Sequence, residues 1–202
     1  SLDGRQPVND RMRPTVNGKG SYEIIVPKFQ KLVASRGTKD YYVRGTFTRD
    51  NLDFSQDVLH MGDLGFRHVS VEPASGPLDD PFAIKEEDLE KVEAEYEKLA
   101  RQLMERPDIN FFHFNVDLAQ GPCVIKRLRG CGAGCEYVAI TPDGDIYPCH
   151  QFVGKEEYRM GNVFDGSFDM DLSGIFAQQN IYTRPACRDC WARFYCSGGC
   201  RA

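Results

Sequence analysis

Neither a membrane-spanning run nor a basic stripe is present in this sequence of 202 residues. No stretch approaches the ~20 apolar residues needed to span a bilayer, and no signal peptide is visible at the N-terminus. The 25 basic and 30 acidic residues are interspersed and give a net charge of −5, which excludes the concentrated positive charge of a nucleic-acid-binding protein. We therefore expect a cytoplasmic protein that binds neither membranes nor nucleic acid.

Cysteine is absent from the first 122 residues, whereas eight cysteines follow between Cys123 and Cys200. Because no secretion signal is visible, this distribution favours metal binding in a reducing compartment over a disulfide framework. The length and the 41% hydrophobic content suffice for one domain and a smaller cysteine-rich one. We place the boundary near residue 120, which divides the chain into residues 1–120 and 121–202.

The cysteine-free part alternates between strand and helix patterns. Strands are predicted where β-branched and aromatic residues gather, over Tyr41–Thr48, Arg67–Glu72 and Asn110–Phe114. Strands alternating with helices of ten or more residues are typical of parallel β–α–β units. We therefore expect an α/β fold, either part of a β/α barrel or a doubly wound sheet.

Three helices are predicted between these strands and before them. Ser21 is a suitable N-cap for the first helix and Gly37 a suitable end, although Pro27 lies inside the pattern. A short helix around Val58 should end near Gly62. The clearest amphipathic helix carries apolar residues at three- and four-residue intervals: Leu89, Val92, Tyr96, Leu99 and Leu103. The polar segment from residue 9 to residue 20 is expected to be a loop.

The cysteines of the C-terminal part form two groups. The first contains Cys131, Cys135 and Cys149, and the second has the spacing Cys187-x2-Cys190-x5-Cys196-x3-Cys200. A β-hairpin closed at Asp143-Gly144 precedes Cys149. A C-x2-C turn lets two thiolates face one metal, and thiolates suit zinc or iron in a cluster. Spacing alone leaves both metals open, and the isolated Cys123 is interpreted as a small buried residue.

This spacing resembles the SPASM domain, the auxiliary-cluster domain of radical S-adenosylmethionine (SAM) enzymes that modify peptides. Both halves of its pattern are present, first Cys131-x12-Gly144-x4-Cys149 and then C-x2-C-x5-C-x3-C ending at Cys200. The family has a further Cys downstream, so we expect the domain to be truncated here. The segments at residues 1–4 (SLDG) and 8–11 (VNDR), together with Arg44 and the strand ending at Glu72, resemble the radical SAM barrel.

The resemblance implies the C-terminal half of a radical SAM β/α barrel followed by a small cysteine-rich α+β SPASM domain. It extends to maturases of SCIFF peptides, which join a peptide Cys sulfur to the α-carbon of another residue, and more distantly to anaerobic sulfatase-maturating enzymes. The implied cofactors are SAM and two auxiliary [4Fe-4S] clusters. The implied partners are a cysteine-rich precursor peptide and an electron donor such as ferredoxin or flavodoxin. No C-x3-C-x2-C motif for SAM cleavage occurs here, so we expect this fragment alone to be inactive.

Metal ligands follow from the same resemblance. One auxiliary cluster would take Cys131, Cys149 and Cys200. The other would take three residues of the second group: Cys187, Cys190 and Cys196. Cys135 would be either a further ligand of the first cluster or a residue beside an iron site left open for a substrate thiol.

Contacts to SAM are implied for Ser1, through its hydroxyl, and for Arg44, through a pair with the methionine carboxylate. The alternatives are a strand-end hydroxyl and a barrel salt bridge. Asp3 would orient cofactor or substrate, or cap a turn, and Glu72 would face the active side or form a structural ion pair. The position of His150 resembles that of an Asp that acts as the catalytic base in sulfatase-maturating relatives, and the change to His puts that role in doubt.

Other polar and aromatic residues are given structural interpretations. His60, His68 and His113 lie in helix or strand patterns. The aromatic residues between the second-group cysteines are interpreted as core of the small domain, with cluster shielding as the alternative: Trp191, Phe194 and Tyr195.

Two further function classes stay open. A zinc-stabilised binding module would use the metal only to fold the cysteine-rich half. An iron–sulfur electron-transfer protein would hold clusters without a SAM or peptide site.

Overall fold

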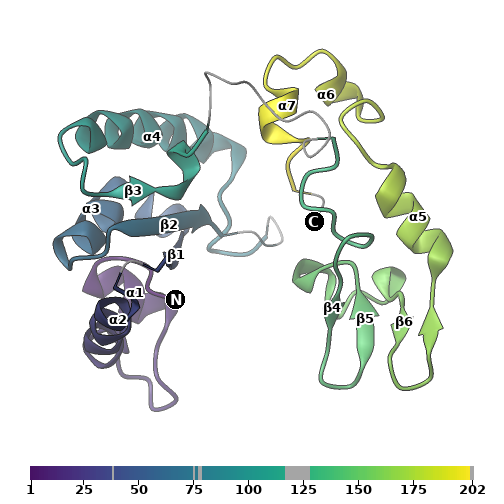
Figure 1. Cartoon of the computed structure of the whole chain (residues 1–202), viewed down its shortest axis with the longest axis horizontal. Helices are drawn as coiled ribbons and strands as arrows, with labels where there is room; N and C mark the ends of the chain where they lie inside the picture. Colours follow the sequence, from purple (N-terminus) through teal and green to yellow (C-terminus); the bar gives the residue numbers. More distant parts are fainter. Residues whose placement is uncertain (38, 75, 77–78, 117–127, 201–202) are drawn as a thin grey trace. The chain divides into compact units, whose positions relative to one another are not determined.

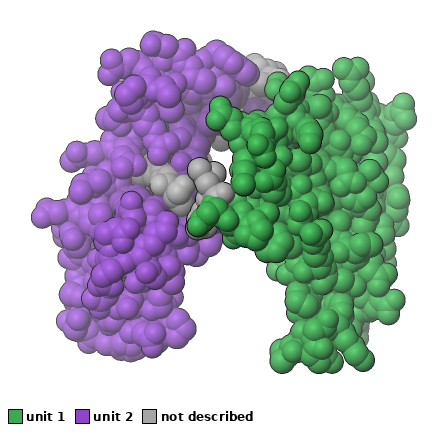
Figure 2. Space-filling model, turned by 180° about the vertical axis from the view of Figure 1, so that it is seen from behind, with its two compact units in different colours: residues 1–115 green, residues 116–202 purple. Residues whose placement is uncertain are grey.

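A computed structural model describes residues 1–37, 39–74, 76, 79–116 and 128–200. The chain divides into two compact units, Ser1–Asn115 and Val116–Ala202 (Figure 2). The boundary expected near residue 120 and the isolated Cys123 lie outside the described residues. Within the described part, no helix has both the length and the apolar character needed to cross a membrane.

The first unit contains a three-stranded parallel sheet of order β1-β2-β3 (Figure 1): β1 (Val43–Phe47), β2 (His68–Pro73) and β3 (Asn110–Phe111). In the register, Arg44 lies beside Ser70, and Thr46 lies beside Glu72. The predicted parallel β–α–β arrangement is confirmed. The predicted third strand is too long, because the chain turns into a short 3₁₀ helix at Phe112–Phe114.

One long helix precedes these strands and two connect them. They are α2 (Tyr22–Arg36), α3 (Ser55–Asp63) and α4 (Leu89–Met104), with short 3₁₀ turns at Arg49–Asn51 and Glu86–Asp88. Their apolar sides bury Phe54, Val58 and Leu99 against Val69 and Val71 of β2. Because successive side chains of a strand point to opposite faces, the apolar residues face the helices. Arg44 and Glu72 therefore stand on the other, polar face of the sheet.

The expected loop at residues 9–20 is partly wrong, because α1 covers Gln6–Met12. Its Asn9 is buried and accepts a hydrogen bond from the backbone N–H of Asp3 at 3.3 Å. The helix after Ser21 is confirmed, but the Ser21 hydroxyl does not cap it and donates instead to the carbonyl of Arg13 at 2.6 Å. The acceptor for the first N–H group of α2 is the Asp10 carboxylate, 2.7 Å from the nitrogen of Tyr22.

The second unit contains a four-stranded antiparallel sheet of order β4-β5-β6-β7. Its strands are short: β4 (Ala139–Ile140), β5 (Asp145–Tyr147), β6 (Gly161–Asn162) and β7 (Ser167–Phe168). The predicted hairpin is confirmed, with Ile140 beside Ile146 and Gly144 at φ 83° in its turn. A side chain is strained at such a φ, which explains the glycine. Cys149 follows the second strand of this hairpin.

Three helices follow the sheet: α5 (Met170–Gln178), α6 (Pro185–Arg188) and α7 (Arg193–Cys196). Short 3₁₀ turns lie at His150–Phe152 and Glu156–Tyr158. One buried cluster of this unit contains Ala133, Tyr147, Cys149, Phe152 and Phe176, and three further apolar side chains are buried outside it: Ile146, Met160 and Ile181. The described core is smaller than that of the first unit, and small domains commonly use a metal or disulfides as a further source of stability.

Candidate metal centre and inner face of the sheet

The turn that carries Cys131 and Cys135 is fixed to the residue before Cys149. The backbone N–H of Gly134 donates to the carbonyl of Tyr137 at 2.9 Å and to that of Pro148 at 3.0 Å. Gly134 has φ 79°, and a Cβ atom there would lie 2.8 Å from the Phe176 ring. A glycine is therefore required at this position, and the turn lies against the end of β5.

Tyr137 faces the sulfurs of both Cys131 and Cys149. Its hydroxyl lies 4.0 Å from Cys131 Sγ. Burial, followed by the neighbouring charges and hydrogen bonds of Cys131 and Cys149, raises the pKa of Tyr137 to about 12. The phenol therefore stays protonated at neutral pH. These contacts bring together two cysteines that are 18 positions apart in sequence.

Cys135 shares the turn but has different neighbours. Its thiol donates to the carbonyl of Gly132 at 3.3 Å and lies 4.0 Å from that of Ala133. The side chain is half-buried. The turn thus presents Cys131 toward Tyr137, while the Cys135 thiol is bonded to the turn's own backbone.

The second group of cysteines is held by two short helices. The N–H of Cys190 donates to the carbonyl of Cys187 at 3.2 Å, which closes the C-x2-C turn. Arg184 donates to the carbonyl of Gly198. A Cβ at Gly198 would lie 3.8 Å from Cys187 Sγ, so the chain before Cys200 passes beside Cys187.

The chain before Cys200 also passes beside the residue before Cys131. A Cβ placed on Gly130 would lie 3.2 Å from the carbonyl oxygen of Ser197 and 3.7 Å from that of Gly199. The two cysteine groups therefore meet through their backbones. This contact lies within the second unit and joins segments 67 or more residues apart.

The donor set fits iron–sulfur clusters. None of the seven described cysteines forms a disulfide: Cys131, Cys135, Cys149, Cys187, Cys190, Cys196 and Cys200. In the described part of the chain, no three Cys, His, Asp or Glu side chains are gathered tightly enough to hold a single ion. The described donors are thiols on short turns, and thiolates are the ligands that hold iron–sulfur clusters.

The polar face of the parallel sheet carries a hollow of about 410 Å³, lined by Tyr42, Arg44, Ser70, Glu72 and Phe112. Arg44 and Glu72 therefore belong to one site. Residues 1–4 run along β1, with the N–H of Leu2 donating to the carbonyl of Arg44 at 2.9 Å. Ser1 is exposed at the start of this segment, next to the strand that carries Arg44.

Glu72 is held in this hollow by Ser70 and His113. The Ser70 hydroxyl donates to Glu72 Oε1 at 2.6 Å, and His113 Nε2 lies 2.7 Å from Oε2. Burial opposes ionisation, but these hydrogen bonds and the charges of His113 and Arg44 lower the pKa of Glu72 overall. Glu72 is therefore an anion at neutral pH. His113 is thus a structural partner of Glu72, which was one of the two alternatives for this residue.

Tyr96 extends this arrangement into the core. Its hydroxyl lies 2.8 Å from His113 Nδ1. Burial, followed by the charge of Glu72, raises the pKa of Tyr96 to about 12. The imidazole thus has a partner on each ring nitrogen. Sequence reasoning treated Tyr96 only as an apolar position of a helix, and no local spacing connects it to Glu72.

Asp3 holds the first segment in place. Its side chain is fully buried, pairs with Arg13 Nε at 2.7 Å and accepts the N–H of Thr46 at 2.9 Å. The carboxylate therefore joins the start of the chain to β1 and to the end of α1.

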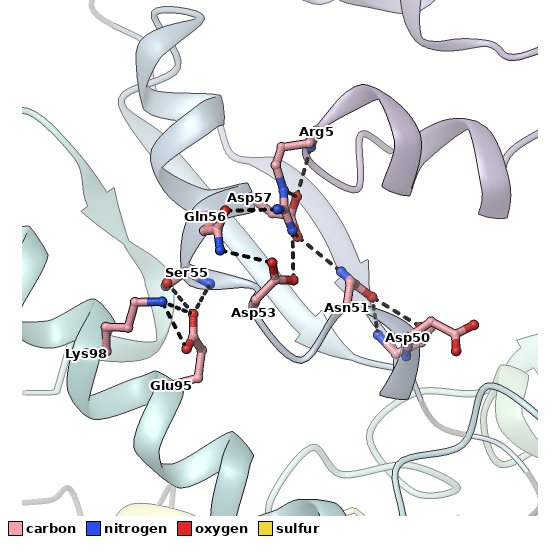
Figure 3. Close-up of polar contacts among 10 residues, drawn as sticks. Arg5, Asp50, Asn51, Asp53, Ser55, Gln56, Asp57, Glu95 and Lys98 are labelled. Atoms are coloured by element: carbon pink, nitrogen blue, oxygen red, sulfur yellow. Dashed lines mark hydrogen bonds and ion pairs between the residues drawn. The ribbon is translucent and has the colours of Figure 1, made fainter.

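A second polar network fixes the start of α1 on α3 (Figure 3). Arg5 donates to Asp57 Oδ1 and to Asp53 Oδ1, both at 2.8 Å, and Asn51 donates to Asp57 Oδ2 at 3.1 Å. Asp57 is fully buried. On the other side of α3, Ser55 donates to Glu95 of α4. None of these pairs was evident from spacing along the chain.

Comparison with known proteins agrees with this geometry. Residues 131–191 match the SPASM family, described as an iron–sulfur cluster-binding domain. The chain is 29% identical over 215 residues to mycofactocin maturase MftC of Mycolicibacterium smegmatis (strain ATCC 700084 / mc(2)155), covering 100% of this chain and 52% of the relative. It is 23% identical over 217 residues to a cysteine-type anaerobic sulfatase-maturating enzyme of Clostridium novyi (strain NT), covering 100% and 56%.

The fold matches the solved structure described as native anSMEcpe with bound AdoMet. The TM-score is 0.68 at 16% sequence identity, over 99% of this chain and 57% of that chain. This chain is a relative of the radical SAM maturases. It spans about half the length of the curated relatives described above.

In the second unit, the expected core position of Trp191 is wrong, and the role of His150 stays open. Trp191 lies in the short turn between α6 and α7 and is 87% exposed, so it is not part of the domain's core. Phe194 is half-buried, with the Arg193 guanidinium 4.9 Å from its ring centre. His150 is exposed beside Cys149, and its catalytic role stays a hypothesis. The structural interpretations of His60 and His68 agree with their bonds to Tyr22 at 2.6 Å and Asn110 at 3.1 Å.

Proposed function

We propose that the protein is a radical SAM maturase that forms Cys thioether cross-links in a ribosomally made, cysteine-rich peptide of the SCIFF type. The observation that carries the proposal is the convergence of Cys131 and Cys149 at Tyr137, in a domain of the SPASM family. The relatives support it, since their names describe a mycofactocin maturase and a sulfatase-maturating enzyme. The names of these two relatives mention neither a cysteine-rich peptide nor a thioether, so these two parts of the proposal need their own test.

Two auxiliary [4Fe-4S] clusters are proposed for the second unit. Cys131, Cys149 and Cys200 hold the first, which is supported by the contact of Gly130 with the segment before Cys200. Cys187, Cys190 and Cys196 hold the second. When bound, such clusters accept electrons and provide an iron that lowers the pKa of a thiol.

Cys135 is proposed either as a further ligand of the first cluster or as a neighbour of an iron left open for the substrate. The hydrogen bond from its thiol to the Gly132 carbonyl is compatible with the second alternative, in which Cys135 binds no iron. Replacement of Cys135 by Ala distinguishes the two, because only a ligand role predicts loss of iron from the first cluster. A neighbour role predicts full iron content.

SAM is proposed to lie on the polar face of the parallel sheet. Arg44 pairs there with the methionine carboxylate, since a guanidinium matches a carboxylate in geometry and charge, and the Ser1 hydroxyl bonds to the ribose. Glu72, held as an anion, gives the hollow a second charged group of opposite sign. The 202 residues contain no C-x3-C-x2-C motif, so SAM cleavage requires a cluster held outside them, reduced by ferredoxin or flavodoxin.

Metal content tests the cluster part of this proposal. The chain is reconstituted anaerobically with iron and sulfide, and iron, sulfide and zinc are assayed with the visible spectrum. Two [4Fe-4S] clusters predict about eight irons per chain and a broad charge-transfer band. A colourless chain that retains zinc would instead support the zinc-stabilised module.

Activity is tested on the full-length gene product with cysteine-rich precursor peptides encoded near it. The proposal predicts SAM-dependent loss of one hydrogen pair per cross-link, located by mass spectrometry at a Cys. Full clusters and SAM cleavage without any change in such peptides would contradict the thioether assignment. Clusters without SAM cleavage would instead favour the electron-transfer protein.

A further inference from the structure

Tyr137 lies at the edge of the proposed first cluster site. Its hydroxyl is 4.0 Å from Cys131 Sγ, at the outer limit of an O–H···S contact, and it also faces Cys149. The side chain is about half-exposed, so the ring stands at the surface and not in the small core. A proton donor and an aromatic ring therefore lie against two sulfur atoms.

The position of Tyr137 is fixed by the same bonds that position the cysteines. Its carbonyl accepts the N–H of Gly134, which also donates to the carbonyl of Pro148. A short bridge joins Ala133 to Tyr137. The donor, the Cys131 turn and the residue before Cys149 are thus parts of one bonded unit.

The direction of the hydrogen bond follows from the chemistry of the groups. A cysteine that binds iron does so as a thiolate, which accepts hydrogen bonds but has no proton to donate. The phenol must therefore be the donor. Hydrogen bonds to the sulfurs of an iron–sulfur cluster are among the features that set its reduction potential.

We propose that Tyr137 is a positioning residue for the cluster held by Cys131 and Cys149, and that its hydroxyl donates to a thiolate ligand and raises the cluster's reduction potential. The reason is electrostatic, since reduction adds negative charge that a hydrogen-bond donor stabilises. This inference rests on the proposed function, because it requires a cluster at that site.

The test compares three variants of the reconstituted chain. Tyr137→Phe removes only the hydroxyl oxygen, whereas Tyr137→Leu removes the ring as well. Tyr182→Phe is the matched control, because Tyr182 is about equally exposed in the same unit and, among the described residues, its hydroxyl makes no hydrogen bond to a sulfur. The readouts are iron and sulfide content, the midpoint potentials from a titration followed by EPR, and coupling of an exchangeable proton to the cluster by ENDOR.

We expect Tyr137→Phe to keep full iron and sulfide, to shift one midpoint potential to a more negative value and to lose one exchangeable-proton coupling. The other cluster and the Tyr182→Phe chain should match the wild type. Unchanged potentials and proton coupling in Tyr137→Phe would overturn the inference, as would a shift seen only in Tyr137→Leu, which would assign the effect to shielding by the ring. A wild-type chain that takes up no iron would overturn the proposed function itself. If the wild-type chain does hold clusters, unchanged potentials in Tyr137→Phe would overturn only the role of Tyr137.

Discussion

The two units of this chain are stabilised in different ways. The first has thirteen buried residues in one apolar core between a parallel sheet and its helices. Among its described residues, the second has a cluster of five buried residues, three further buried apolar side chains and seven cysteines, none in a disulfide. Apolar burial accounts for the first fold, whereas we expect the second to depend also on its tight turns and on the metal that its thiols are proposed to bind. The comparison predicts that the two units respond to different perturbations.

Metal removal should produce the largest difference. Structural metal sites contribute on the order of 10 kcal/mol to small domains, so chelation of iron should unfold the second unit and leave the first folded. Hydrogen exchange followed by mass spectrometry checks this, with loss of protection expected over residues 128–200 only. Equal loss in both units would break the comparison.

Core truncation should show the opposite pattern. Phe54 is fully buried and stacks on Phe47 with ring centres 4.2 Å apart. Phe54→Ala should destabilise the first unit by about 3–5 kcal/mol, with no change in iron content. The matched change Phe176→Ala, in the core of the second unit, should reduce iron content. Denaturation curves measure the loss of stability and iron assays the loss of metal in both variants. A loss of iron in Phe54→Ala equal to that in Phe176→Ala would contradict the comparison.

Turn geometry should matter most in the second unit. Gly134→Ala introduces a side chain at φ 79° and 2.8 Å from the Phe176 ring, which should cost roughly 2–4 kcal/mol. Gly166→Ala is the control, because it has φ 73° but no atom within 4 Å of the added Cβ, and it should cost about 1 kcal/mol. Equal losses of stability in the two variants would show that strain alone, and not the packing of the cysteine turn, sets the cost.

The smallest effect is expected from pH and belongs to the first unit. The folded pKa of Glu72 lies below its ordinary value of 4.5. Its ionised form therefore stabilises the fold above about pH 4.5, and this contribution is lost as the pH falls through the lower folded pKa. Glu72→Gln should flatten this acid limb of the stability curve by less than about 1 kcal/mol. An unchanged acid limb would show that the bonds from Ser70 and His113 do not favour the anion.

The strands and long helices of the first unit could be predicted from the sequence because apolar periodicity determines them. Helix α1 was missed, since it depends on contacts of Asn9 with Asp3 and of Asp10 with the start of α2. The third strand was overestimated because Phe112 and Phe114 have strand propensity, but only Asn110 and Phe111 pair with β2. Propensity describes single residues, whereas these outcomes depend on neighbours distant in sequence.

The candidate sites also combine features that the sequence could predict with contacts that it could not. Cysteine spacing indicated a metal centre, because the spacing itself brings ligands together on short turns. Spacing could not indicate that Tyr137 faces the sulfurs, or that His113 bridges Glu72 and Tyr96 across 41 and 17 positions. Those contacts exist only after the sheet and the glycine turn have formed.

The central claim is that the cysteines of the second unit hold iron–sulfur clusters, and Mössbauer spectroscopy of the chain reconstituted with isotopically enriched iron tests it most directly. The account predicts signals of two [4Fe-4S] clusters that contain nearly all the iron. Cys131→Ala combined with Cys149→Ala should remove one set of signals, and Cys187→Ala combined with Cys190→Ala the other. Iron found only as unclustered ions, unchanged by these substitutions, would contradict the account.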